Sequence, residues 1–212
     1  MALPNVDNIE KLYDANDSET ILKRALSDLN LKKKNWKTYL VMIVICIVPA
    51  AGVGISHETV LLSYEISSDL LNVFLSLFGA VFTGYAFFQA LINDDMLTML
   101  LNVKAKIRDK DGCKFQEINE NLVNLMVQYV LAILMNLFVK TVLSFIPEDL
   151  TIFAHGWINN SLAGLVLSGY FFFTALILWR MISFLFNMFQ LFNLHAATRA
   201  LEIVKRDKNI GR

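Results

Sequence analysis

Four segments of the chain are apolar over the length that a membrane requires. A helix needs about 20 apolar residues to cross a hydrocarbon core of about 30 Å, because each residue advances it by about 1.5 Å. The segments that meet this length are 39–55, 70–92, 122–145 and 161–180. They lack the alternation of apolar and polar residues that a membrane barrel requires. The pattern therefore predicts an all-α fold, an integral membrane four-helix bundle spanning 38–194.

Basic residues gather in alternate segments between these spans. Lysine and arginine precede the first span, fill the loop 94–120 and follow the fourth span, whereas 56–69 and 141–160 contain neither. Cytoplasmic loops of membrane proteins carry an excess of these residues. The pattern predicts that both termini lie in the cytoplasm, with 56–69 as an outer loop.

The N-terminal segment 1–37 is polar but patterned, and we expect it to be a cytoplasmic arm. Asn16 and Glu19 resemble a capping box, with asparagine in the place of the usual serine or threonine. The apolar residues that follow recur on one helical face, which predicts an amphipathic helix over 17–34. The membrane surface, the bundle or another chain could cover this face.

The inner loop 94–120 has a similar pattern. Met96, Leu100, Val103 and Ile107 recur at helical spacing, and basic residues occupy the other positions: Lys104, Lys106 and Arg108. This spacing predicts a short basic helix at the inner membrane interface. A turn is expected at 109–112, where Asp, Lys, Asp and Gly follow one another.

The fourth apolar segment is longer than a helix needs to be to cross the bilayer. Trp179 and Arg180 are expected at the inner interface, yet apolar residues continue to Leu194. A helix over 161–194 would be about 51 Å long at 1.5 Å per residue. The cytoplasmic extension 181–212 therefore begins with aromatic side chains that need cover, among them Phe184, Phe189 and Phe192. It either packs among other helices or bends into the interface. We favour packing, and from it we expect a homo-oligomer or a partner.

Polar and small residues mark two faces inside the bundle. The third span carries a polar stripe made by Asn121, Asn124, Gln128, Asn136 and Lys140, and Ala132 fills the gap so that the steps are three and four. Such a stripe joins helices through hydrogen bonds or lines a wet path, and the first interpretation is favoured. Small residues at Gly79 and Gly84 in the second span, and at Gly164 and Ser168 in the fourth, predict close helix packing.

Composition narrows the function classes. The chain is 56% apolar and 18% charged with a formal net charge of zero. These values exclude a disordered chain and an ordinary soluble enzyme, and they give no reason to expect nucleic-acid binding. No metal-ligand or nucleophile spacing occurs within a span, so neither enzyme activity nor a cofactor is predicted.

The layout resembles the KwaA family, the small four-helix membrane subunits of the bacterial Kiwa anti-phage system. The resemblance lies in the chain length, the polar N-terminal arm, the short outer loops, the segment from Phe87 to Asp95, and Trp179-Arg180 with its apolar continuation. It implies an oligomeric sensor in the bacterial inner membrane that responds to phage attachment. It also implies a cytoplasmic DNA-binding effector as partner.

Two hypotheses of function follow. The first is a membrane sensor or scaffold that contacts the lipid bilayer, forms a homo-oligomer and recruits or controls a cytoplasmic effector. The alternative is a small oligomeric pore or channel, motivated by the polar stripe of the third span.

Overall fold

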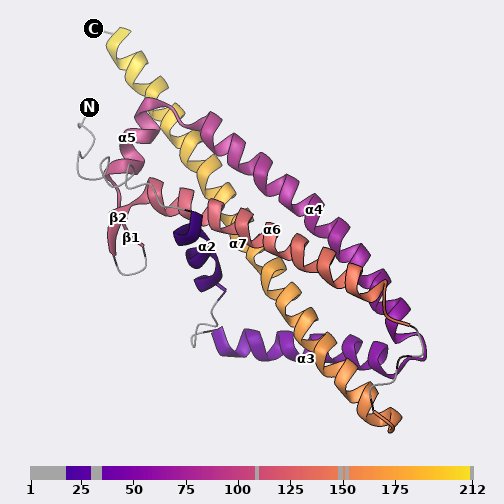
Figure 1. The fold of residues 1–212 in the computed structure, drawn as a ribbon. Coiled ribbons are helices and arrows are strands. Elements are labelled where there is room, and N and C mark those ends of the chain that lie inside the picture. Colours follow the sequence, from indigo (N-terminus) through magenta and orange to yellow (C-terminus); the bar gives the residue numbers. More distant parts are fainter. Residues whose placement is uncertain (1–17, 30–34, 108–109, 148–149, 151–152, 211–212) are drawn as a thin grey trace. The chain divides into compact units, whose positions relative to one another are not determined.

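The computed structural model describes residues 18–29, 35–107, 110–147, 150 and 153–210, which are almost entirely helical (Figure 1). Its elements are α2 (Ser18–Ser27), α3 (Trp36–Ile55), α4 (Thr59–Leu91), α5 (Asp94–Asn102), β1 (Lys104–Ile107), β2 (Lys110–Cys113), α6 (Lys114–Leu143) and α7 (Gly156–Ile210). Four helices, α3, α4, α6 and α7, are long and apolar enough to cross a membrane. The prediction of four such helices is therefore confirmed.

The chain forms two compact units. The α3 unit comprises residues 25–79 and 127–181, and the hairpin unit comprises 18–24, 80–126 and 182–210. Helices α2, α4, α6 and α7 contribute residues to both units.

Helix α4 begins earlier than the hydropathy pattern predicts. The segment 56–69, expected as an outer loop, is helical from Thr59 onward. Its buried positions Ser63, Ser67 and Phe74 are separated by four and seven residues, which is helical spacing. Glu65 and Asp69 lie on the exposed side. Charges on that side lower the mean hydropathy without interrupting the helix, so the prediction of a loop was wrong.

The basic helix predicted at the inner interface was also wrong in part. Helix α5 ends at Asn102, and an antiparallel hairpin of β1 and β2 follows, in which Lys104 pairs with Cys113 and Lys106 with Asp111. The reason is visible in the sequence: apolar and basic residues alternate strictly from Val103 to Lys106, and alternation at every second residue is strand spacing. The expected turn at 109–112 overlaps β2.

The amphipathic N-terminal helix is shorter than predicted. It runs from Ser18 to Ser27 and closes with a bond from the Leu29 N–H to the Leu26 carbonyl, 3.0 Å long. The capping residue expected at Asn16, and residues 30–34, lie outside the described part of the chain. Ala25 is fully buried, whereas Leu22 and Leu26 are exposed.

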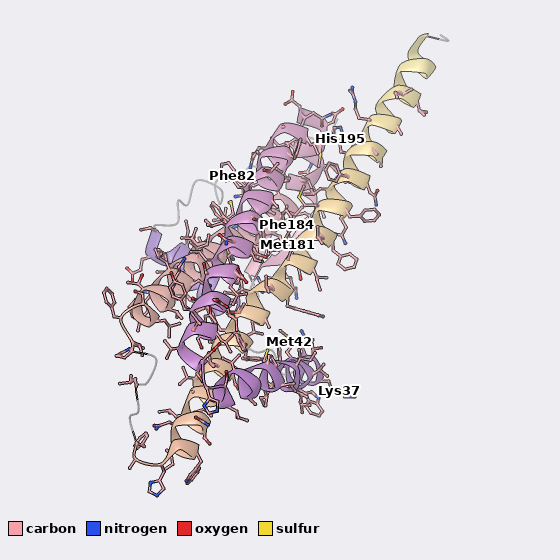
Figure 2. All side chains as sticks on the ribbon, turned by 90° about the vertical axis from the view of Figure 1, so that its right-hand side faces the viewer. Lys37, Met42, Phe82, Met181, Phe184 and His195 are labelled. Carbon is pink, nitrogen blue, oxygen red and sulfur yellow. The ribbon has the colours of Figure 1, made fainter. Side chains whose placement is uncertain are left out.

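In the hairpin unit, one face of α7 is buried and packs against α4. Phe184, Met188 and Leu191 are buried at steps of four and three. The Phe184 ring lies against α4 at Gly84 (Figure 2). Between α4 and the start of α6, the rings of Phe88 and Phe115 stack with centroids 5.8 Å apart.

Candidate functional site

In the α3 unit, the stripe residues Gln128 and Asn136 of α6 are fully buried and hydrogen-bonded within the chain, although the Gln128 Oε1 atom has no partner among the described residues. Asn136 is fully buried and donates from Nδ2 to the Ala132 carbonyl at 2.7 Å. It also accepts a hydrogen bond from the Tyr170 hydroxyl of α7. Burial of an amide is costly unless it is hydrogen-bonded, so this bond ties α6 to α7. This hydrogen bonding supports the interpretation that the stripe joins helices, in preference to the interpretation that it lines a water-filled path.

The same helix holds the C-terminal end of α2. Gln128 is fully buried and donates from Nε2 to the Ala25 carbonyl at 2.8 Å. The last carbonyls of a helix have no partner inside the helix, and a side-chain donor satisfies them. Gln128 therefore caps α2 from α6.

Arg180 of α7 holds the same end of α2. Its guanidinium donates to the Asp28 carbonyl at 3.0 Å and lies 3.7 Å from the Asp28 carboxylate. A cation is favoured at a helix C-terminus, where the carbonyl dipoles point outward. The sequence placed Arg180 at a membrane interface, and here it also links the last span to the N-terminal helix. We refer to Gln128 and Arg180 with the two α2 residues that they contact, Ala25 and Asp28, as the α2 clamp.

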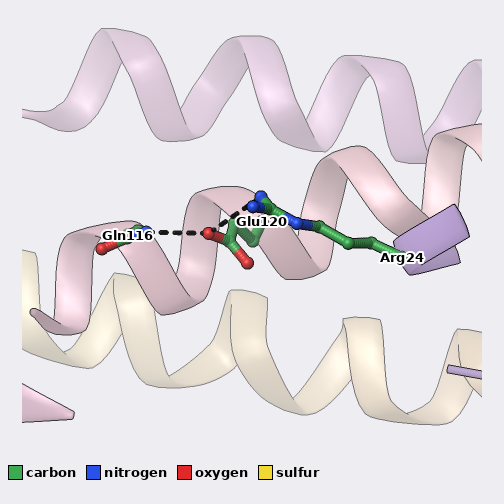
Figure 3. A network of polar contacts seen from close by, with 3 residues as sticks. All are labelled: Arg24, Gln116 and Glu120. Atoms are coloured by element: carbon green, nitrogen blue, oxygen red, sulfur yellow. Dashed lines mark hydrogen bonds and ion pairs between the residues drawn. The ribbon is translucent and has the colours of Figure 1, made fainter. Parts of the chain in front are cut away.

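In the hairpin unit, a second polar contact holds α2. Arg24 lies 3.4 Å from Glu120 Oε1, and Gln116 Nε2 donates to the same oxygen at 2.8 Å (Figure 3). Glu120 is mostly buried, so the pair is better shielded from water than an ion pair on an open surface. Two stripe residues lie on the same stretch of α6: Asn124 is buried and Asn121 is half-buried.

Lys140, the last residue of the predicted stripe, is half-buried in the α3 unit. Its ammonium donates to the Ser68 hydroxyl at 3.0 Å and lies 5.3 Å from the centre of the Tyr64 ring. Both partners come from α4. A hydroxyl and an aromatic face thus anchor this cation at the end of α6.

The aromatic residues of α7 divide between two faces in the hairpin unit. Phe184 is buried, whereas Phe189 and Phe192 are exposed. Four of the exposed apolar positions form a stripe at steps of three, four and three, made by Ile182, Leu185, Phe189 and Phe192, and the exposed Phe186 lies beside it. We call this set the α7 stripe. Trp179, in the α3 unit, is also exposed.

The small residues differ in how closely they are packed. A Cβ added at Gly84 would lie 2.5 Å from Phe184 Cζ, whereas one at Gly79 would meet nothing within 4 Å. Gly164 supplies the backbone against which Gly54 of α3 packs, where an added Cβ would lie 2.9 Å from the Gly164 nitrogen. Ser168 donates to the Gly164 carbonyl at 2.7 Å. The close contact of Gly54 was not predicted from the sequence.

The basic side chains of the predicted inner-interface surface lie on the hairpin. Lys104 and Lys106 are exposed on β1, and Arg108 lies outside the described residues. No group of three His, Cys, Asp or Glu side chains within the described ranges is placed to hold a metal ion.

No family model, curated protein or solved structure matches this chain.

Proposed function

We propose that this protein crosses a membrane with α3, α4, α6 and α7, and that it assembles into a homo-oligomer through the α7 stripe. The observation that carries the proposal is the spacing of the stripe. Exposed apolar residues at alternating steps of three and four are the pattern by which one helix packs against another. The opposite face of the same helix uses this spacing for Phe184, Met188 and Leu191, which are already buried.

The polar groups of the hairpin unit favour a protein partner over lipid. Lys114 and Glu117 form an ion pair of 2.8 Å at the start of α6, beside the stacked rings of Phe88 and Phe115. Charged side chains are costly in hydrocarbon, so we assign this unit to the cytoplasmic side of the membrane. There the α7 stripe would meet water, at a cost of about 25 cal/mol for each Å² left uncovered.

The assembled protein would act as a sensor or scaffold. The α2 clamp joins α6 and α7 to the N-terminal arm, so a stimulus that shifts these helices would change how α2 is held. The basic loops are the reason for placing both termini in the cytoplasm. The resemblance to the Kiwa membrane subunits is the reason for proposing the bacterial inner membrane as the location. That resemblance also supplies the remaining parts of the proposal, a response to phage attachment and control of a cytoplasmic effector.

The particle mass in mild detergent tests self-association. We expect the wild-type protein to run as an oligomer, and Phe189→Glu to dissociate it. Burial of a phenylalanine side chain is worth about 1.5–3 kcal/mol, so each lost contact weakens association by about tenfold or more. Gln190→Glu is the matched control, because it adds the same charge at the next, exposed position outside the stripe. A monomeric wild-type particle would contradict the proposal, as would dissociation by both variants alike.

A further inference from the structure

The α3 unit contains a cavity of about 510 Å³ that the proposed assembly does not use. It lies where α3 ends and α4 begins, between the end of α6 and the start of α7. We propose that this cavity binds one acyl chain of a glycerophospholipid, with the ester groups of the lipid at a rim of hydroxyl and amide side chains.

Small residues on two helices create the space. Gly54 of α3 packs directly on the α7 backbone, and its added Cβ would lie 3.1 Å from the Asn160 carbonyl oxygen. Gly156 and Ala163 of α7 also line the cavity without filling it. Larger aliphatic side chains form the walls, chiefly Val60, Val139, Leu143, Ile146, Leu162 and Leu167. The size falls within the range of about 300–1,000 Å³ that small-molecule sites occupy. It is too small for a helix, which is about 10–12 Å across with its side chains.

The rim supplies hydrogen-bond donors without a fixed charge. Within the described part of the chain, the lining includes no Lys, Arg, Asp or Glu, so these residues offer an anionic or cationic metabolite no ion pair. Four polar residues of the lining are already used by the fold. The Tyr170 hydroxyl donates to Asn136, and the Ser56 hydroxyl oxygen accepts from the Glu58 N–H. The Thr59 hydroxyl donates to the Val53 and Ser56 carbonyls, and the Asn159 amide bonds both backbone groups of Phe153.

Other rim donors remain for a ligand. The side chains of Ser63, His57 and Asn160, which all line the cavity, make no hydrogen bond to another described residue. Neutral donors of this kind suit ester carbonyls, which only accept hydrogen bonds. An apolar chamber with such a rim therefore matches an acyl chain and its ester better than a soluble polar ligand.

The cavity opens on a side of the unit that is itself apolar. Leu162 and Val166 belong both to the lining and to the exposed surface of α7. The neighbouring exposed residues Leu165 and Phe145 are also apolar. In the proposed topology this surface faces the hydrocarbon of the outer leaflet, so a lipid chain can enter sideways without crossing water.

Photo-crosslinking of the full-length protein in phospholipid nanodiscs tests the site. The probe is a phosphatidylcholine with a diazirine on one acyl chain, and labelled peptides are mapped by mass spectrometry. We expect labels to concentrate on Leu143, Ile146 and Leu162. Unlabelled phosphatidylcholine should compete, whereas free fatty acid, which lacks the glycerol ester, should compete at least fivefold less well. Equal competition would overturn the assignment of the ester to the rim.

Two neighbouring substitutions separate a filled cavity from a changed surface. Val166→Trp places a large ring at the opening, and Leu165→Trp places the same ring on the next residue, which is 72% exposed against 62% for Val166 and does not line the cavity. We expect Val166→Trp to reduce labelling at Leu143 and Ile146 at least fivefold, and Leu165→Trp to leave it unchanged. Equal labelling in the two variants, or wild-type labelling spread evenly over exposed α3 residues, would overturn the proposal.

Ala163→Leu covers the case in which Val166→Trp does not fold. It fills the cavity from the α7 wall with a smaller side chain and should also reduce labelling. The particle mass is measured on the same samples. An oligomer that fails to label rejects the lipid site alone, and a monomer that labels rejects the proposed assembly alone.

Discussion

Helix α3 and the hairpin-unit part of α7 both expose apolar side chains, but in different arrangements. On α3 the exposed residues cover the whole helix except the buried face of Met42, Cys46, Ala50 and Gly54: they are Leu40, Val41, Ile43, Val44, Ile45, Ile47 and Val48. On α7 from Ile182 to Asn193, the exposed apolar residues, which are the α7 stripe and Phe186, alternate with exposed polar residues such as Ser183, Gln190 and Asn193.

The two arrangements indicate that α3 and the α7 stripe contact different surroundings. Lipid surrounds a helix, so a helix that faces lipid is apolar on every side that the protein leaves open. A partner helix covers one stripe, and the residues beside the stripe remain polar. The angular distribution of exposed apolar residues is therefore more informative than their number. It assigns α3 to lipid and the α7 stripe to protein.

The largest expected effect comes from placing a charge on each surface. Val44→Arg puts a guanidinium in the middle of α3, where insertion scales assign a cost of about 2.5–3.5 kcal/mol. We expect it to reduce the carbonate-resistant membrane fraction about tenfold or more. Phe189→Arg should insert as the wild type does and lose only self-association. If Phe189→Arg impairs insertion as strongly as Val44→Arg, the α7 stripe faces lipid and the distinction fails.

The next largest effect is expected where α3 packs against α7. Gly54→Ala would place a Cβ 2.9 Å from the Gly164 nitrogen, and neither backbone can yield. We expect a loss of about 1–3 kcal/mol, as for other overpacked sites. This would appear as a lower midpoint in thermal unfolding in detergent. Gly52→Ala is the control, because its Cβ meets nothing within 4 Å. A helix surrounded by lipid with no fixed contact to α7 would tolerate both substitutions equally.

The sequence predicted four membrane-length helices because hydropathy records which segments avoid water. Mean hydropathy failed to predict the structure at two places. The strict alternation from Val103 to Lys106 marked a strand, which mean hydropathy does not detect. The earlier start of α4 rests on the burial of Ser63 and Ser67, which only the fold shows.

The candidate site was predicted only in outline. Gln128 and Arg180 were singled out as polar residues within or beside apolar spans, but their partners could not be predicted. The Ala25 and Asp28 carbonyls are backbone groups, more than a hundred residues away in the chain. Backbone acceptors leave no mark in a sequence, so only the fold shows that these two side chains cap the same helix. The cavity likewise results from the packing of the helices, and no sequence motif predicts it.

A moderate effect is expected at the α2 clamp. Arg180→Met removes the donor to the Asp28 carbonyl, and hydrogen bonds to charged groups contribute about 1.5–3 kcal/mol. Amide hydrogen exchange in α2 should therefore accelerate about tenfold to a hundredfold. Lys23→Met provides the contrast, because it removes a highly exposed ion pair with Glu19 within α2 and should change exchange little. Similar exchange in both variants would show that α7 does not hold the arm.

The smallest effect is expected from substitutions of two glycines of α4. Comparing these variants tests which helix mediates assembly. Gly79→Ala should stabilise the protein, since alanine is favoured over glycine in a helix by about 1 kcal/mol and the added Cβ meets nothing within the chain. Its unfolding midpoint should rise by about 2–4 °C. Gly84→Ala should lose this gain, because its Cβ displaces the Phe184 ring on the buried face of α7. Neither variant should change the particle mass. Should Gly79→Ala dissociate the oligomer, the subunits would meet through the small residues of α4, and the α7 stripe would no longer be needed to explain assembly.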